Sequence, residues 1–349
     1  MARLKFIIPI LILALLWSCS SPKPSTQNPK IPKKTENYTS AFPQSDVSEL
    51  LKDVQQSVVR VVATGYYDSY SFGDGLVTMD EIQSQSPEQL ANITYTVEES
   101  TAGTAIILDQ YNSHYLLITA EHVVAFPDTA TAYREGNGMP ENTFLKSISI
   151  KRRQTNLAYT GQEIKSFEVI ASNNQQDLAL LDLELEENSN LDPYPLSLSF
   201  GDTDYLQLGS FLYMLGFPKG YAMVTRGLAS SSESWNDRFF VTDAVFNPGI
   251  SGGPIMASRD NFQSLEWVGM VSSATASREN VLVPRPSTEK YSNILRPYND
   301  SVFVEEKTRI NYGIAQAVPI NQIKEFLLEH EELISRRGYR LIRKRNLSR

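Results

Sequence analysis

The chain has 349 residues, of which 41% are hydrophobic and 21% are charged. This composition supports a packed core and excludes disorder throughout. The formal net charge of −8 argues against a generally basic nucleic-acid binder, and no nucleic-acid partner is expected. One cysteine and three histidines exclude a disulfide framework and a Cys/His-rich zinc module, so we expect neither a metal nor a cofactor.

The first residues have the layout of an export signal. Arg3 and Lys5 precede an apolar run that ends at Trp17, which is too short to span a membrane as a helix. Residues 16–19, Leu-Trp-Ser-Cys, resemble the lipobox of bacterial lipoproteins. The resemblance implies that Cys19 is lipidated and anchors the exported protein to a membrane of the bacterial cell envelope. The alternative is an ordinary signal peptide with an incidental cysteine.

Composition then divides the chain into segments. We expect a signal peptide over residues 1–18, a Ser/Pro/Lys-rich tether over 19–45, one folded domain over 46–335 and a basic tail over 336–349. The tail carries seven Lys or Arg and no acid. It is interpreted either as a solvated end or as a contact for anionic lipid head groups.

The folded domain opens with a short helix that begins near Asp46 and Ser48, where an acidic cap precedes an apolar-periodic stretch. Residues 321–335 close it with an amphipathic helix. Between these helices almost every apolar run has four to eight residues, which favours a sandwich or barrels. The predicted strands are 57–63, 104–109, 115–120, 146–151, 166–171, 178–185, 210–216, 223–230, 238–245, 265–273 and 312–318.

Two further patterns give local expectations. The polar stretches 65–99, 127–143 and 276–308 are predicted to be long loops. In the strand 178–185, leucines alternate with acids, which predicts a half-buried strand with Asp182 facing solvent.

The strongest chemical signal is a serine among glycines, Asn-Pro-Gly-Ile-Ser-Gly-Gly-Pro over residues 247–254. Glycine permits a tight turn that a substrate can approach closely. The amides of Gly249 and Ser251 could then share one concavity, as an oxyanion hole requires. A serine nucleophile also needs a base to take its proton.

The base is expected to be a histidine, and three are available. His330 lies in an acidic helix and His114 in a polar turn, whereas His122 ends a predicted strand. A buried carboxylate must orient the imidazole. Asp177, directly before an apolar strand, is the first choice for this role, and Asp182 is the second.

These residues lie in motifs that resemble the three catalytic motifs of trypsin-like serine peptidases, in that family's order. They are Thr-Ala-Glu-His-Val-Val around His122, Asp-Leu-Ala-Leu-Leu from Asp177, and the glycine-rich turn around Ser251. The segments 103–107, 215–218, 224–227, 267–271 and 312–320 resemble the HtrA (Deg) branch. Two positions depart from the branch: Glu121 stands where a small or amide residue is usual, and Ile250 where a polar residue is common.

The resemblance implies an all-β fold of two six-stranded antiparallel β-barrels, flanked by the short amino-terminal helix and the closing amphipathic helix. Barrel one is expected over about 57–195, with His122 and Asp177, and barrel two over about 200–320, with Ser251. No counterpart is expected of the PDZ modules that the HtrA branch normally carries. The resemblance also implies a specificity pocket lined by Val245, Val271, Ser272, Ser273 and Ala274. With no acid among these residues, a small or medium apolar substrate side chain is favoured over a basic one.

The sequence therefore predicts a serine endopeptidase that acts on protein or peptide substrates. The Gly-x-Ser-x-Gly pattern also fits the nucleophile elbow of α/β-hydrolases. Gly252 and Gly253 are poor residues to begin the helix which that elbow requires, and only His330 follows the serine. A surface-anchored binding protein on a trypsin-like fold, with little or no turnover, remains as the alternative. Oligomeric state is left open.

Overall fold

The computed structural model of the protein describes residues 34–134, 140–161, 163–185, 194–231, 239–284 and 301–341. The expected signal peptide and Cys19 lie outside these residues, as do positions 342–349 of the basic tail. Strands dominate the described chain, which confirms the all-β prediction. Among the described residues, no helix is long and apolar enough to cross a membrane.

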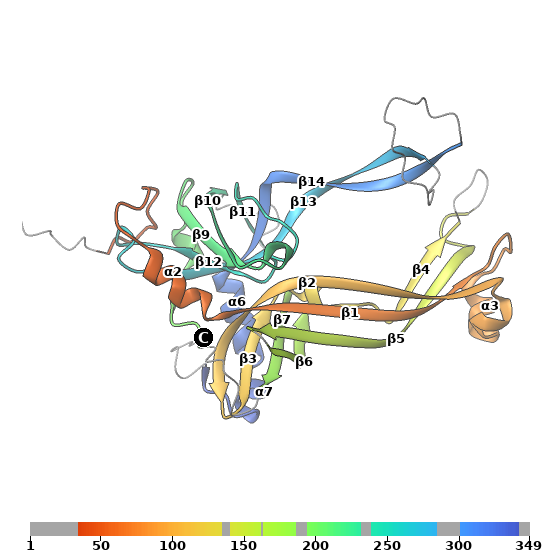
Figure 1. Cartoon of the computed structure of the whole chain (residues 1–349), viewed down its shortest axis with the longest axis horizontal. Helices are drawn as coiled ribbons and strands as arrows, with labels where there is room; N and C mark the ends of the chain where they lie inside the picture. Colours follow the sequence, from red (N-terminus) through yellow and green to blue (C-terminus); the bar gives the residue numbers. More distant parts are fainter. Residues whose placement is uncertain are drawn as a thin grey trace, which may run out of the picture. The chain divides into compact units, whose positions relative to one another are not determined.

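The first barrel is a closed ring of six antiparallel strands (Figure 1). Its order is β1-β2-β3-β7-β6-β5, and the pairing of β5 with β1 closes the ring. A seventh strand, β4, pairs with the other edge of β5. The bounds are β1 Val58–Ser71, β2 Ile93–Tyr111, β3 His114–Thr119, β4 Thr129–Tyr133, β5 Leu145–Thr160, β6 Glu163–Asn173 and β7 Leu178–Glu184.

The second barrel repeats this plan with the ring β12-β9-β10-β11-β14-β13, closed by the pairing of β12 with β13. A short strand, β8, lies parallel to β13. The prediction of two six-stranded antiparallel barrels is therefore confirmed. The bounds are β8 Ser199–Phe200, β9 Phe211–Gly216, β10 Met223–Ser231, β11 Phe240–Thr242, β12 Pro254–Ala257, β13 Glu266–Pro284 and β14 Val302–Pro319.

Helices flank the barrels at both ends of the described chain. The amino-terminal helix α2 and the closing helix lie where the sequence predicts them, but the closing helix is divided in two. His330 has φ −101° and ψ 15°, which ends α6 before α7 begins. The bounds are α2 Ser48–Gln55, α5 Glu121–Val124, η1 Thr203–Tyr205, η2 Pro218–Gly220, α6 Ile320–Glu329 and α7 Glu331–Arg336.

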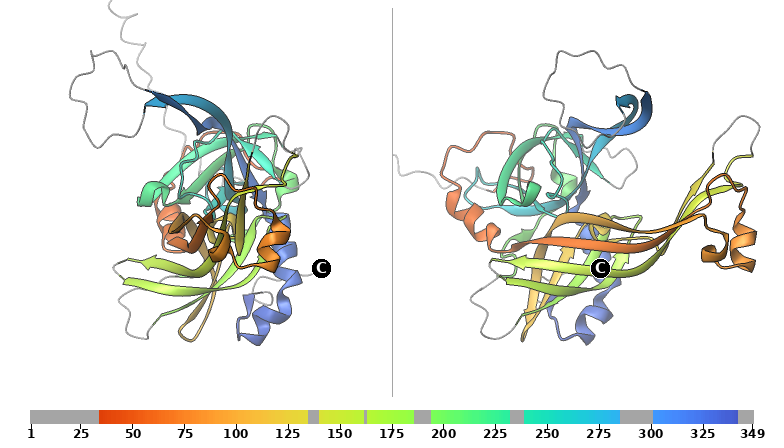
Figure 2. Two further views of the ribbon diagram at one scale, coloured as in Figure 1. Left: turned by 90° about the vertical axis from the view of Figure 1, so that its right-hand side faces the viewer. Right: turned by 45° about the vertical axis from the view of Figure 1, so that its right-hand side comes forward.

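Two of the predicted loops are instead two-stranded arms (Figure 2). β1 and β2 stay paired from Val58↔Ile106 to Ser71↔Ile93, and β13 and β14 from Gly269↔Pro319 to Pro284↔Val302. The first arm ends in the helices α3 Met79–Ser84 and α4 Pro87–Leu90. The predicted loop at 127–143 likewise contains β4. The arm residues of β2, β13 and β14 are mostly exposed or half-buried. Burial does alternate along β1, but at Gly65, Tyr67 and Ser69, so these strands lack the aliphatic alternation by which a half-buried strand is recognised.

Strand β7 is buried on both faces, which corrects the expectation that it is half-buried. Asp182 is only 7% exposed. Its carboxylate lies 2.8 Å from His114 Nδ1 and accepts a hydrogen bond from Arg337 Nη1, also at 2.8 Å. Arg337 comes from the start of the segment expected to be a basic tail, so neighbouring elements cover the acidic side of the strand. In that same segment Tyr339 and Leu341 are buried in the main hydrophobic core, to which both barrels contribute.

The end of the segment expected to be a tether is bound to barrel two. Thr35 and Thr39 donate backbone hydrogen bonds to the carbonyls of Arg259 (2.8 Å) and Ser258 (2.9 Å). Tyr38 is buried, and its hydroxyl donates to a carboxylate oxygen of Glu266 at 2.7 Å. Residues 35–39 therefore form part of the folded unit.

Candidate active site

His122 and Asp177 form a directly bonded pair on barrel one. His122 lies in α5, which follows β3, and Asp177 is the last residue before β7. Nδ1 of His122 is 2.9 Å from Oδ1 and 3.0 Å from Oδ2 of Asp177, and the backbone N–H of His122 donates to Oδ1 at 3.1 Å. This geometry makes Nδ1–H the donor and leaves Nε2 free to act as a base.

The surroundings of Asp177 in the folded protein favour the ionised form of its carboxyl group. Burial alone raises the pKa of this carboxyl, which is 8% exposed. The hydrogen bond and the charge of His122, together with a hydrogen bond from Ser272 Oγ at 2.5 Å, outweigh burial and leave the pKa below its ordinary value. Asp177 also has φ +55°, a left-handed conformation that short polar side chains tolerate better than most others.

Ser251 sits in a turn whose shape requires glycine. The N–H of Ile250 donates to the carbonyl of Asn247 at 3.2 Å, which closes a turn with Pro248 and Gly249 at its centre. Gly249 has φ +104°, and a Cβ there would lie 2.5 Å from the carbonyl oxygen of Phe217. A side chain at this position would therefore be both strained and blocked.

The carbonyls of this turn are held by neighbouring donors. Lys219 N–H donates to Pro248 O at 2.9 Å, and Gly253 N–H donates to Ile250 O at 3.0 Å. In a trans peptide the N–H points opposite to the carbonyl of the same unit. The amides of Gly249 and Ser251 therefore point away from these two donors. Both amide N–H groups are available to a ligand.

The side chain of Ser251 lies beside His122 in a small pocket. Its hydroxyl donates to the backbone carbonyl of Ser272 at 2.8 Å. Ser251 and His122 both line a cavity of about 170 Å³, together with Phe246, Asn247, Pro248, Ile250 and residues 272–274. The structure thus brings together the nucleophile, the base and the acid that the sequence nominates. Ser272, expected only as a pocket residue, contacts both Ser251 and Asp177.

The predicted specificity residues separate into two groups. Ser272, Ser273 and Ala274 line the 170 Å³ pocket. Val271 is buried in the core of barrel two and Val245 is exposed, and neither is among the pocket-lining residues. Phe246 and Ile250 supply the apolar wall instead. Val271 precedes an irregularity in the pairing of β13, and Val245 follows the end of β11, so neither orientation could be chosen from the resemblance.

The other two histidines lie away from this pocket. His114 faces Asp182 on barrel one, and His330 stacks on Phe326, with Nδ1 2.9 Å from the Phe326 carbonyl. In the described ranges, no group of three or more His, Cys, Asp or Glu side chains is placed to hold a metal ion.

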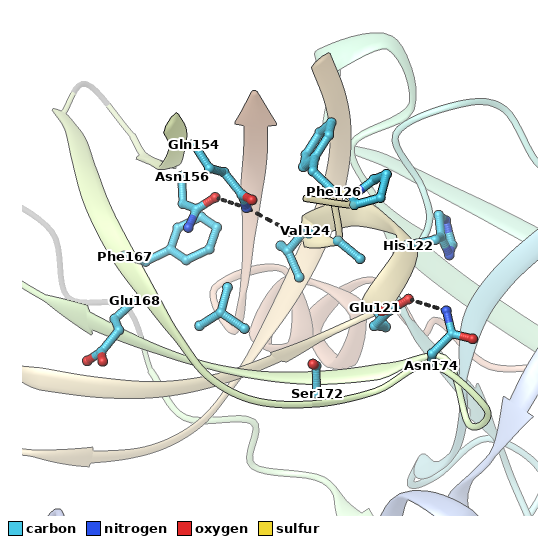
Figure 3. A pocket seen from close by; sticks show the side chains of 13 residues that line it. Glu121, His122, Val124, Phe126, Gln154, Asn156, Phe167, Glu168, Ser172 and Asn174 are labelled. Atoms are coloured by element: carbon cyan, nitrogen blue, oxygen red, sulfur yellow. Dashed lines mark hydrogen bonds between the residues drawn. The ribbon is translucent and has the colours of Figure 1, made fainter. Parts of the chain in front are cut away.

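A second and larger cavity, of about 950 Å³, opens on barrel one (Figure 3). Its walls come from α5, the loop that follows α5, β5 and β6, and His122 lies at one end. No local motif indicates this cavity, because residues from three separate segments form it. The one signal was Glu121, which departs from the usual residue type before the histidine and lines the cavity.

Comparison with known proteins agrees with this geometry. Residues 103–263 match the model of the trypsin-like peptidase domain. The chain is 24% identical over 276 residues to the serine protease Do-like HtrA of Lactobacillus helveticus, covering 75% of this chain and 57% of that protein. It is 35% identical over 97 residues to a probable periplasmic serine endoprotease, DegP-like, of Rickettsia prowazekii, covering 25% and 18%.

A third similar protein is the probable periplasmic serine protease do/HhoA-like of Haemophilus influenzae, 33% identical over 104 residues, which cover 28% of this chain and 21% of that protein. The matched part of the chain thus spans less than two thirds of each of these relatives. The double barrel and the match over residues 103–263 agree with the fold of a trypsin-like peptidase domain. The similar proteins are named as serine proteases, and the HtrA name among them agrees with the resemblance seen in the sequence motifs.

Proposed function

We propose that the protein is a serine endopeptidase that cleaves protein substrates through an acyl-enzyme. Ser251 attacks the scissile carbonyl, and His122 accepts the serine proton and then gives it to the leaving amine. Asp177 holds the imidazole in the required tautomer and stabilises its protonated form. The observation that carries this proposal is the bonding of Asp177 to His122 Nδ1 at 2.9 Å beside a pocket that Ser251 also lines.

The resting hydrogen bond of Ser251 must be given up before attack. The Ser251 hydroxyl donates to Ser272 O, and we expect a rotation of this side chain to release that bond so that the hydroxyl can donate to His122 Nε2. Catalytic hydrogen bonds are often long or misaligned before substrate binds and tighten in the complex. Substrate binding in the 170 Å³ pocket is the event that we expect to favour this rotation.

The amides of Gly249 and Ser251 are proposed to hold the developing oxyanion. Each such donor contributes on the order of 3 kcal/mol to transition-state stabilisation. The hydrogen bonds to Pro248 O and Ile250 O support this assignment because they fix the orientation of both peptide units.

The 170 Å³ pocket is proposed to take the residue whose carbonyl is attacked. Its lining combines Phe246, Ile250 and Ala274 with the serines 272 and 273, and it includes no carboxylate. A small or medium apolar side chain suits this volume and lining.

Export and lipid anchoring at Cys19 complete the proposal. Relatives named as periplasmic support export to the cell envelope, and the lipobox resemblance nominates Cys19. Cys19→Ser in the full chain is expected to move the protein from the membrane fraction to the soluble fraction of the envelope. An unchanged membrane fraction would contradict the anchor without bearing on the peptidase chemistry.

Hydrolysis of a reduced, unfolded protein substrate by the full chain tests the endopeptidase. We expect fragments from the wild type and from Ser264→Ala, an exposed serine of barrel two, and none from Ser251→Ala. Fragments from all three at equal rates would rule out Ser251 as the nucleophile. Tight substrate binding by the wild type without cleavage would favour a binding protein on the same fold. The resting hydrogen bond from Ser251 to Ser272 O is compatible with that alternative, because it keeps the hydroxyl on a partner other than His122.

A further inference from the structure

The 950 Å³ cavity and the 170 Å³ pocket meet at His122, which lines both of them. His122 is the one residue common to the two linings. A peptide held with its scissile residue in the smaller pocket must pass His122, so a side chain near the scissile bond can reach the larger cavity. Figure 3 shows Glu121 and His122 at one end of this cavity and Gln154, Asn156 and Phe167 at the other.

Glu121 is a buried carboxylate with few partners. The residue is 8% exposed. In the described part of the chain, its one hydrogen bond to a side chain comes from Asn174 Nδ2 to Oε2 at 3.2 Å, and no Lys or Arg lies within ion-pair distance. A buried carboxylate without a compensating charge is costly to hold. A ligand cation would supply the missing charge-assisted hydrogen bonds.

Two of the other polar side chains that line the cavity have partners of their own. Glu168 is largely exposed and pairs with Arg337 at 2.9 Å. Gln154 Nε2 donates to Val124 O and to Asn156 Oδ1, both at 2.8 Å. Of the two carboxylates that line the cavity in the described part of the chain, Glu121 is therefore the one without a cationic partner, and it can accept hydrogen bonds from a donor that carries positive charge.

The remaining walls suit the stem of a long side chain. Val124, Phe126, Phe167 and Val169 line the cavity with apolar surface. Lysine and arginine bury their methylene stems against apolar surface while the charged end meets a polar group. The cavity offers both parts of that arrangement.

We propose that the 950 Å³ cavity is a second substrate pocket, which binds a lysine or arginine side chain near the scissile bond with its charged end on Glu121. This inference rests on the proposed peptidase function, because that function places the peptide across His122. The protein would then select a small apolar residue at the bond that is cut and a basic residue close to it.

The test is a peptide series with one small apolar residue at the cleaved bond. Lys, Gln and Glu are placed in turn at each of three positions on either side. At one of these positions, the wild type should cleave the Lys peptide with a kcat/KM roughly tenfold higher than that of the Gln peptide. The free energy of a hydrogen bond to a charged group corresponds to a factor of about this size. This comparison uses only the wild-type protein and does not depend on the folding of a variant.

Glu121→Gln should bring the Lys/Gln ratio close to one, and Glu121→Lys should shift the preference towards Glu. Glu168→Gln is the matched variant in the same cavity, and it should change the ratio less than threefold because Arg337 already neutralises that carboxylate. A ratio that persists in Glu121→Gln, or no preference for Lys at any position, would overturn the proposal.

A binding measurement separates this inference from the peptidase proposal. The full-length Ser251→Ala protein should bind the preferred Lys peptide roughly tenfold more tightly than its Gln analogue, as measured by fluorescence anisotropy. Cleavage of the series without a Lys preference would reject the pocket alone. A Lys preference in binding, with no cleavage by the wild type, would reject the peptidase and keep the pocket.

Discussion

The backbone N–H of Thr104, on β2 of barrel one, donates to the carbonyl of Ser251 in barrel two at 2.8 Å. The side chain of the same threonine continues the link: Oγ1 donates to Gly249 O at 2.9 Å and accepts from Phe217 N–H at 3.0 Å. Thr104 is fully buried. One residue of the first barrel therefore holds the peptide units that directly follow Gly249 and Ser251, next to the two amides proposed for the oxyanion hole.

Replacing Thr104 tests this link. Thr104→Val keeps the shape but removes the hydroxyl, which leaves Gly249 O and the Phe217 amide without their partner. We expect a destabilisation of about 1–3 kcal/mol in urea unfolding and a fall in kcat/KM greater than that in Thr104→Ser, which keeps the hydroxyl. Equal kcat/KM in the valine and serine variants would show that the hydroxyl does not position the turn.

Asp177 and Asp182, the two acids nominated from one strand, should have separable roles. Asp177→Asn should lower kcat by about 10⁴-fold, because an asparagine favours the wrong imidazole tautomer. Asp182→Asn weakens contacts with His114 and Arg337, so it should lower the free energy of unfolding and affect kcat far less. Steady-state kinetics and urea unfolding of both variants check this, and a larger kcat loss in Asp182→Asn would reverse the assignment.

Acid should destabilise the protein through Asp177. The pKa of this carboxyl is lowered in the native state, so the unfolded state binds a proton more readily. The resulting stability is complete above the unfolded value of about 4 and is lost as pH falls through the lower native value. Urea midpoints measured between pH 6 and pH 3 should therefore fall more steeply for wild type than for Asp177→Asn. Parallel curves of urea midpoint against pH for the two proteins would contradict the lowered pKa of Asp177.

Much of the fold could be predicted from short apolar runs and turn residues. Most barrel strands and both flanking helices follow from that pattern, because buried strands need continuous or alternating apolar residues. Their arrangement in two six-stranded barrels was implied by the resemblance to trypsin-like peptidases. The arms could not be predicted in this way. Residues 65–71 and 93–99 form paired strands. Most of 93–99 is exposed, and the buried positions of 65–71 are glycine, tyrosine and serine, so neither segment has the aliphatic alternation that marks a strand.

The candidate site, like the fold, could be predicted from the sequence only in part. His122, Asp177 and Ser251 each lie in a recognisable local motif, and the structure brings them together. Thr104 and Ser272 had no such signal, since their roles depend on contacts across 145 and 95 residues of sequence. The cavity beside Glu121 depends likewise on the packing of α5 against β5 and β6, which no local pattern records.

Covalent labelling at Ser251 tests the central claim most directly. The full chain is treated with a fluorophosphonate, its intact mass is measured, and the modified peptide is sequenced. We predict one phosphonyl adduct, located on Ser251, that does not form in Ser251→Ala and forms far more slowly in His122→Ala. No adduct on the wild type, or an adduct on another serine that persists in Ser251→Ala, would contradict the assignment of this site as a peptidase.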